Sequence, residues 1–191
     1  GHTDNVNSAL FSPDGKYIVT ASSDKTAKIW CIYSGECVHT LIGHTGIVNS
    51  VLFSPDGKYI LTASRDKMSK LWSVESGECI HTFIGHTDNV SSALFSSDGK
   101  YIVTASGDGT AKIWCVETGE CVHTLIGHNG WGNSALFSPD GKYIVTASRD
   151  ETAKIWFFRA FCASPFADLV MQALCSCVAQ NLRISRPAKG F

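Results

Sequence analysis

The feature that most constrains this chain is a repeat with a period of 42 residues. The pair Gly-His recurs at residues 1, 43, 85 and 127, and a tryptophan recurs at residues 30, 72, 114 and 156. The first and third units differ at only seven of their 42 positions. A period of this size predicts a repeat architecture, in which neighbouring units bury one another's apolar surface. The four units are residues 1–42, 43–84, 85–126 and 127–157.

Each unit is built from short apolar segments separated by turn signals. In the first unit the segments are residues 6–11, 17–22, 26–32 and 37–42. Turn-forming residues such as Pro-Asp-Gly and Ser-Gly separate them, which predicts hairpins and a four-stranded antiparallel sheet. The segment Tyr-Ile-Val-Thr-Ala-Ser is apolar on both faces, as in sheets that are covered on both sides. Stacked four-stranded sheets of this kind are typical of an all-β propeller.

Several motifs recur in register and together carry a family resemblance. They are the opening Gly-His, the turn Ser-Pro-Asp-Gly, the aspartate of Ala-Ser-x-Asp, and the tryptophan that closes the third segment. On these motifs, residues 1–157 resemble the WD-repeat β-propeller family. The aspartate that usually follows the tryptophan in that family is replaced here by Cys31, Ser73, Cys115 and Phe157. The resemblance implies propeller blades that form an open arc or part of a larger ring.

A histidine, a serine, an aspartate and a tryptophan recur at fixed positions in every unit. The resemblance implies that they form a hydrogen-bonded chain from the carboxylate, through the imidazole and the hydroxyl, to the indole N–H. The donor and acceptor inventory of these groups allows such a chain. A hydrolase triad is the alternative, but four copies in one domain favour a structural brace. The predicted sets are His2, Ser22, Asp24 and Trp30; His44, Ser64, Asp66 and Trp72; His86, Ser106, Asp108 and Trp114; and His128, Ser148, Asp150 and Trp156.

The units differ mainly in two loops, which the family's geometry places on one rim of the propeller. Because variable loops on a rigid scaffold commonly carry function, this rim is the expected partner-binding surface. Trp131 is the most distinctive rim residue, since tryptophan and arginine are enriched in binding hot spots. Packing of Trp131 against its own blade or the C-terminal segment is the alternative. The candidate rim residues are Asp4, Ile47, Arg65, Asp88, Trp131 and Arg149.

Composition narrows the classes of partner. The formal net charge is −1, which gives no overall electrostatic case for nucleic acid or an acidic membrane surface. No run of about 18 apolar residues is present to span a bilayer. The pairs Cys37/His39, Cys79/His81 and Cys121/His123 lie in different units and so do not converge as a zinc site. We therefore expect no metal, no cofactor and no enzymatic activity, protein or peptide partners within a multiprotein complex, and a cytoplasmic or nuclear location.

Residues 158–191 break the repeat, so the fourth unit lacks a fourth strand of its own. Ser164 and Pro165 are typical of a helix start, and apolar residues follow at helical spacing. The sequence predicts a helix at residues 165–182. Four blades would leave apolar side faces open. We expect the chain to be part of a larger ring; a second copy completing a ring of eight, or the helix capping the arc, are the alternatives.

Overall fold

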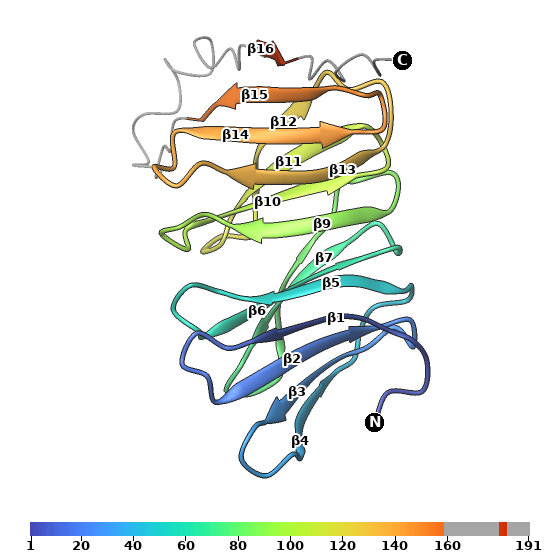
Figure 1. Cartoon of the computed structure of the whole chain (residues 1–191), viewed down its shortest axis with the longest axis vertical. Coiled ribbons are helices and arrows are strands. Elements are labelled where there is room, and N and C mark those ends of the chain that lie inside the picture. The colour runs from blue at the N-terminus through green and yellow to red at the C-terminus, as the bar shows by residue number, and fades with distance from the viewer. Residues whose placement is uncertain (159–179, 183–191) are drawn as a thin grey trace, which may run out of the picture.

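The computed structural model describes residues 1–158 and 180–182, which form four four-stranded antiparallel sheets and no helix (Figure 1). The first sheet contains β1 (Val6–Phe11), β2 (Tyr17–Ser22), β3 (Ala27–Cys31) and β4 (Cys37–Leu41). The second contains β5 (Val48–Phe53), β6 (Tyr59–Ser64), β7 (Ser69–Ser73) and β8 (Cys79–Phe83). The third contains β9 (Val90–Phe95), β10 (Tyr101–Ser106), β11 (Thr110–Cys115) and β12 (Cys121–Ile126). The fourth contains β13 (Gly132–Phe137), β14 (Tyr143–Ser148), β15 (Ala153–Phe157) and β16 (Gln180–Leu182).

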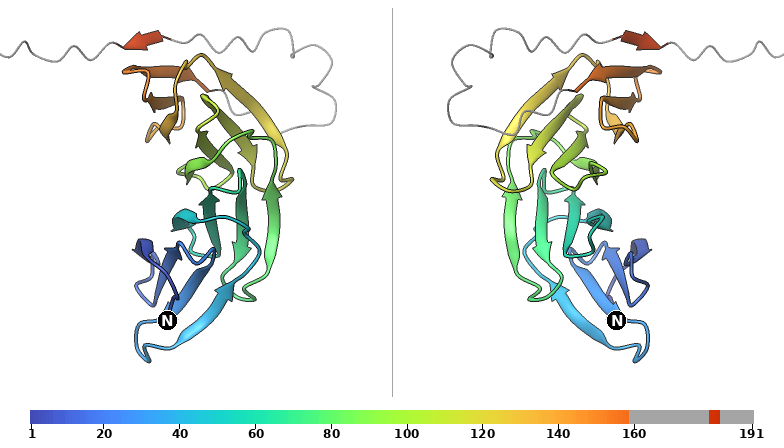
Figure 2. Two further views of the ribbon diagram at one scale, coloured as in Figure 1. Left: turned by 90° about the vertical axis from the view of Figure 1, so that its right-hand side faces the viewer. Right: turned by 90° about the vertical axis from the view of Figure 1, so that its left-hand side faces the viewer.

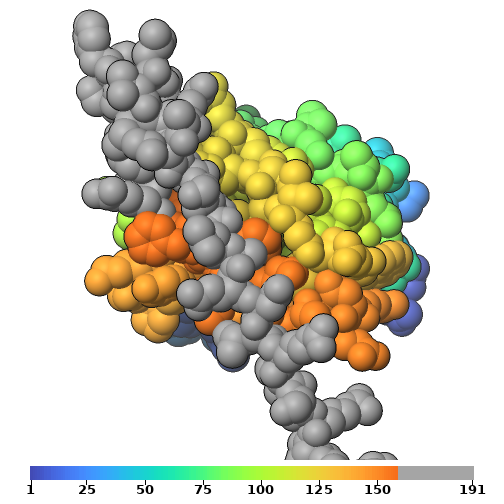
Figure 3. Space-filling model, turned by 90° about the horizontal axis from the view of Figure 1, so that it is seen from above, coloured from blue at the N-terminus to red at the C-terminus, as the bar shows by residue number. Residues whose placement is uncertain are grey.

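The sheets stack in sequence order into an open arc, which confirms the expected propeller-blade fold (Figure 2). Figure 3 looks onto the fourth-sheet end, with the earlier sheets behind it. The first strands of consecutive sheets, β1, β5, β9 and β13, lie side by side. An asparagine amide ties some of them together, since Asn7 Nδ2 donates to the Val48 carbonyl at 2.9 Å and Asn49 Nδ2 to the Val90 carbonyl at 2.8 Å.

The apolar core lies between consecutive sheets, as the two-faced apolar strands predict. Val19 and Ile29 of the first sheet, both fully buried, pack against Val48, Ile60 and Trp72 of the second. The other junctions repeat this pattern with the equivalent residues. The second and third sheets therefore each have a front face, which meets the preceding sheet, and a back face, which meets the following one.

The end of the fourth sheet differs in part from the expectation. The repeat itself supplies only three strands, as expected, and the fourth position is taken by β16 from the C-terminal segment, which pairs antiparallel with β15. The prediction of a helix at residues 165–182 is therefore wrong for its last three residues. Pairing satisfies the otherwise unpaired edge of β15, and this tertiary gain outweighs the helical spacing. Residues 165–179 of that prediction, like its Ser164 cap, lie outside the described residues.

Candidate functional site

The recurring polar residues form a continuous hydrogen-bonded chain inside each sheet. In the second sheet, His44 Nδ1 lies 2.7 Å from Asp66 Oδ2, and His44 Nε2 lies 2.8 Å from Thr62 Oγ1. Trp72 Nε1 donates to the same Thr62 hydroxyl at 2.9 Å. The chain therefore runs from the loop that precedes β5, across the turn after β6, to the indole of β7.

The same chain recurs in the other three sheets with nearly the same geometry. The imidazole lies 2.8 Å from the carboxylate in each of them and 2.7 or 2.8 Å from the threonine hydroxyl. The indole N–H donates to that hydroxyl at 2.8 or 2.9 Å. Regular repetition in four sheets fits a structural brace. The three further sets are His2, Asp24, Thr20 and Trp30; His86, Asp108, Thr104 and Trp114; and His128, Asp150, Thr146 and Trp156.

The hydroxyl in this chain is a threonine, so the prediction of a serine there is wrong for Ser22, Ser64, Ser106 and Ser148. Ser64 Oγ instead accepts from the Asp66 amide and donates to the Gly46 carbonyl, both at 3.1 Å. Thr62 lies two residues deeper in β6, on the same face, where it meets both rings. Both hydroxyls are constant in all four units, so the sequence offered no signal to choose between them. The serine joins the two loops instead.

Burial sets the direction of the hydrogen bonds along the chain. Burial lowers the pKa of His44 and of His86 below the ordinary value of 6.5, although the neighbouring carboxylates oppose this shift. Each ring is therefore neutral at pH 7, with Nδ1–H donating to the aspartate and Nε2 accepting from the threonine. The threonine hydroxyl is then free to accept the indole N–H, and every polar group of the chain has a partner.

The aspartates remain ionised although they are largely buried. Burial acts to raise the pKa of Asp108, but hydrogen bonds from Thr110, the Thr87 amide and His86 together lower it to about 2. The pKa of Asp66 is lowered as well, because hydrogen bonds and the nearby His44 ring outweigh its burial. Each carboxylate therefore acts as a permanent acceptor that fixes the loop and the turn beside it.

Backbone hydrogen bonds bring the two variable loops of each unit together on one rim. The Arg149 amide donates to the Trp131 carbonyl at 2.8 Å, and the Arg65 amide donates to the Ile47 carbonyl at 2.9 Å. The amides of Ser23 and Gly107 make the equivalent bonds in the first and third sheets. The other turns lie at the opposite edge, where the Val74 amide donates to the Lys58 carbonyl.

Trp131 lies at the junction between the third and fourth sheets and is 41% exposed. The Arg149 guanidinium covers its ring, with Cζ 4.8 Å from the ring centroid. The ring edge and the Asp88 carboxylate both lie beside Gly107 of the neighbouring turn, where even an added Cβ would fall 3.0 Å from Asp88 Oδ2. An aromatic ring, a guanidinium and a carboxylate thus share one small surface, which we call the Trp131 patch.

The other candidate rim residues lie on the same rim but outside this patch. Arg65 is exposed beside the half-buried Ile47 in the second sheet. Asp4 is exposed at the first sheet, where its carboxylate accepts from the Asn5 amide at 2.7 Å and its carbonyl accepts from Ser22 Oγ at 3.2 Å. The Trp131 patch is therefore the part of the rim where unlike side-chain chemistries converge.

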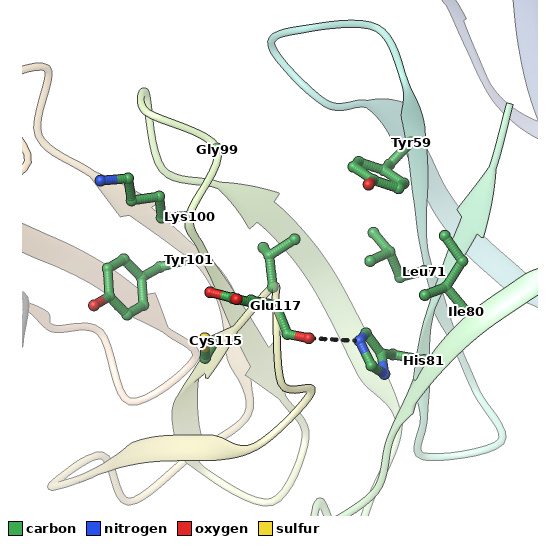
Figure 4. Close-up of a pocket in the computed structure, with 10 residues that line it drawn as sticks. Tyr59, Leu71, Ile80, His81, Gly99, Lys100, Tyr101, Cys115 and Glu117 are labelled. Atoms are coloured by element: carbon green, nitrogen blue, oxygen red, sulfur yellow. Dashed lines mark hydrogen bonds between the residues drawn. The ribbon is translucent and has the colours of Figure 1, made fainter. Parts of the chain in front are cut away.

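A pocket of about 390 Å³ lies between the second and third sheets at the edge opposite the rim (Figure 4). Tyr59 and His81 of the second sheet and Val116 of the third line it, and His81 Nε2 lies 3.3 Å from the Glu117 carbonyl across it. At the next junction the residue equivalent to Val116 is Phe158, whose ring lies 5.2 Å from that of Tyr101 and 6.3 Å from that of His123. A phenyl ring thus fills one junction where a valine leaves the other open.

The cysteines of the described residues are free thiols. Cys37, Cys79 and Cys121 are exposed. They lie in outermost strands, where one side of the sheet is open to solvent. Within residues 1–158 and 180–182, no three histidine, cysteine or acidic side chains gather as a metal site would require. The same residues contain no helix long and apolar enough to cross a membrane.

Comparison with known proteins identifies a matching family. A family model described as the IFT122 first beta-propeller matches residues 5–156. A Ribosome biogenesis protein BOP1 homolog from Drosophila grimshawi is 54% identical over 41 residues, and the Drosophila melanogaster homolog is 51% identical over the same length. Each match covers 22% of this chain and 5% of the relative, so the chain aligns with a small part of these proteins.

Proposed function

Because this chain belongs to the family of the IFT122 first beta-propeller, we propose that it is a non-enzymatic scaffold that holds protein or peptide partners within a multiprotein complex. The Trp131 patch is the observation that carries this proposal. Tryptophan and arginine dominate binding hot spots, and a stacked, partly exposed pair presents both without further ordering. The neighbouring Asp88 adds a charge that can fix the orientation of a partner.

The brace geometry favours a scaffold over a hydrolase. A serine nucleophile needs a hydrogen bond to its histidine base, whereas Ser64 Oγ bonds to the backbone of Asp66 and Gly46. The hydroxyl that does meet the imidazole belongs to Thr62, which is fully buried and accepts the indole N–H of Trp72. The candidate catalytic groups are thus already engaged with one another in every sheet.

We also propose that the protein is located in the cytoplasm or the nucleus. Three exposed free thiols, Cys37, Cys79 and Cys121, suit a reducing compartment such as the cytoplasm or the nucleus. The name of the matched Drosophila proteins refers to ribosome biogenesis, but the shared 41 residues amount to one repeat. That likeness supports a common blade sequence and not a common process.

Affinity capture followed by binding measurements tests the rim proposal. Wild-type protein should retain a partner saturably, and Trp131→Ala should weaken that binding at least tenfold, as expected for a hot-spot aromatic. Tyr33→Ala is the matched control, because Tyr33 is 83% exposed but lies in the turn between β3 and β4, at the opposite edge. Equal loss in both variants, or no loss in Trp131→Ala, would refute the assignment of the patch.

A further inference from the structure

We propose that the pocket between the second and third sheets binds a phenylalanine side chain that a partner peptide presents. The pocket lies at the edge opposite the rim, so this site is separate from the Trp131 patch. The next junction of the same arc shows which group fits, because there the chain itself places a phenyl ring at the equivalent position.

Phe158 is the ring at that next junction, between the third and fourth sheets, and it is 5% exposed. Its centroid lies 5.2 Å from that of Tyr101, 5.5 Å from that of Phe137 and 6.3 Å from that of His123, each in an edge-on arrangement. Aromatic pairs are favourable in this arrangement at separations of about 4.5–7 Å. Three rings therefore hold the phenyl group from different sides.

The junction between the second and third sheets has the same aromatic residues but no ring among them. The residues 42 positions earlier are Tyr59, Phe95 and His81, and Val116 takes the place of Phe158. Tyr59, Phe95 and Val116 pack on one apolar cluster, and Tyr59, His81 and Val116 line the pocket of about 390 Å³. This volume lies in the range of about 300–1,000 Å³ that is typical of ligand sites.

Apolar side chains around the pocket are more exposed than their equivalents around Phe158. Tyr59 is half-buried, whereas Tyr101 is 4% exposed. Ile80 is 43% exposed, whereas the equivalent Val122 is partly buried against the cluster that contains Phe158. Figure 4 shows Tyr59 and Ile80 on the same side of the pocket. A phenyl ring in the pocket would cover both, and this burial would favour binding.

A hydrogen bond across the pocket connects its two walls before any ligand binds. His81 Nε2 donates to the Glu117 carbonyl at 3.3 Å (Figure 4). The equivalent histidine of the first sheet, His39, makes the same contact with the Glu75 carbonyl at 3.1 Å. Because the walls are already connected, a ligand would not have to order them, which lowers the cost of binding.

The charges beside the pocket favour a neutral peptide as the carrier of the ring. Lys100 and Glu117 both line the pocket and are exposed, and they contribute one charge of each sign. The Val116 amide donates to the Lys100 carbonyl at 2.9 Å, as the Phe158 amide does to the Lys142 carbonyl at 2.8 Å. The backbone at this position therefore carries the valine, and the ring has to come from another polypeptide.

A titration followed by nuclear magnetic resonance tests the proposal on the full 191-residue chain. The probes are two neutral peptides, acetyl-Gly-Phe-Gly-amide and acetyl-Gly-Ala-Gly-amide. The amide resonances of Lys100, Val116 and Glu117 should shift saturably at millimolar concentrations of the phenylalanine peptide. The alanine peptide should bind roughly tenfold more weakly or less, because it lacks the buried ring.

Two variants and their matched controls locate the binding. Val116→Phe should remove the saturable shifts at the remaining reporter amides, because its own ring takes the place, whereas Ile84→Phe adds a ring at a residue that is 68% exposed and should bind as wild type does. Ile80→Asp places a charge on the pocket wall and should weaken binding at least tenfold. Val38→Asp changes the equivalent residue of the first sheet, which is also 43% exposed, and should leave binding unchanged. Circular dichroism should show every variant folded.

Three results would overturn the inference. The first is the absence of saturable shifts in the wild type, which would mean that the pocket is closed in solution or already occupied by another segment of the chain. The others are an equal response to the alanine peptide and unchanged binding in Val116→Phe and Ile80→Asp. Trp131→Ala should bind the phenylalanine peptide as wild type does, so this site and the rim can fail separately.

Discussion

A single buried threonine hydroxyl joins the imidazole and the indole in each sheet. In the second sheet, Thr62 is fully buried, donates to the neutral His44 ring and accepts from Trp72. Removing it would strand one donor and one acceptor in a low-dielectric interior, where an unsatisfied group costs more than the bond contributes.

Replacing that hydroxyl with a methyl group tests its role. Thr62→Val should lower the free energy of unfolding by about 1–3 kcal/mol, because Trp72 Nε1–H and His44 Nε2 lose their shared partner. Chemical denaturation measures the loss, and the indole N–H resonance of Trp72 should shift in the same variant. Ser64→Ala should leave that resonance unchanged. If the resonance shifts in Ser64→Ala and not in Thr62→Val, the hydroxyl that accepts from Trp72 would belong to the serine.

The buried histidines make stability depend on pH. Folding lowers the pKa of His44 and His86 below 6.5, so on acidification the unfolded chain binds protons first. Stability should therefore fall as the pH drops below 6.5 and continue to fall until the folded rings titrate. Denaturant unfolding across this range measures the slope, which the double variant His44→Gln/His86→Gln should flatten. A stability that is constant or rises on acidification would contradict the neutral-ring arrangement.

The aspartates cause a second decrease in stability at lower pH. The pKa of Asp108 falls from 3.8 to about 2 on folding, so its contribution is complete above 3.8 and disappears as the pH drops toward 2. Both groups act in the same direction, and acid should therefore loosen the loops from the sheets before it disrupts the apolar junctions.

At the scale of elements, the junctions between sheets share one plan but differ in how fully they are packed. Phe158 is buried between the third and fourth sheets, and its amide donates to the Lys142 carbonyl at 2.8 Å. The equivalent Val116 borders the pocket of about 390 Å³ between the second and third sheets. The repeat therefore continues structurally one residue past the expected end at residue 157.

The chain itself suggests how to fill that pocket. Val116→Phe should raise the free energy of unfolding by about 0.5–1 kcal/mol, because a ring at this position packs on the tyrosine and histidine as Phe158 does. Denaturant unfolding measures the gain. Ile84→Phe adds a ring at a residue that is 68% exposed and should change little. A loss of stability in Val116→Phe would mean that the junction cannot open to admit a ring.

Most of this architecture could be predicted from the repeat, and the exceptions have physical causes. The strands and turns of every sheet follow the pattern of the first unit, because apolar periodicity and glycine turns determine structure over a few neighbouring residues. The choice of Thr62 over Ser64 depends on where a tryptophan from another strand points, which spacing does not encode. The strand β16 was not predicted for a similar reason, because the edge of β15 with which it pairs exists only in the folded chain.

At the scale of the molecule, the described residues form an arc of four braced sheets, and the loops on its rim differ from one unit to the next. Phe11 is 69% exposed and Tyr143 is 45% exposed, whereas their equivalents inside the arc, Phe53 and Tyr101, are buried. From the sequence we expect the chain to be part of a larger ring, with a second copy or a capping helix as the alternatives, and the described residues form an open arc.

The central claim is that the buried hydrogen-bonded chains stabilise the sheets while the rim binds partners. The measurement that tests it most directly is the affinity of a captured partner for two variants, one in a buried chain and one on the rim. Thr104→Val removes a buried brace hydroxyl in the third sheet, and Trp131→Ala removes the exposed ring on the rim. We predict that Thr104→Val binds the partner as tightly as wild type although it unfolds more easily, whereas Trp131→Ala loses at least tenfold in affinity with stability changed by less than about 1 kcal/mol. The claim would be contradicted if Thr104→Val lost affinity at a temperature where the variant is fully folded while Trp131→Ala kept its affinity.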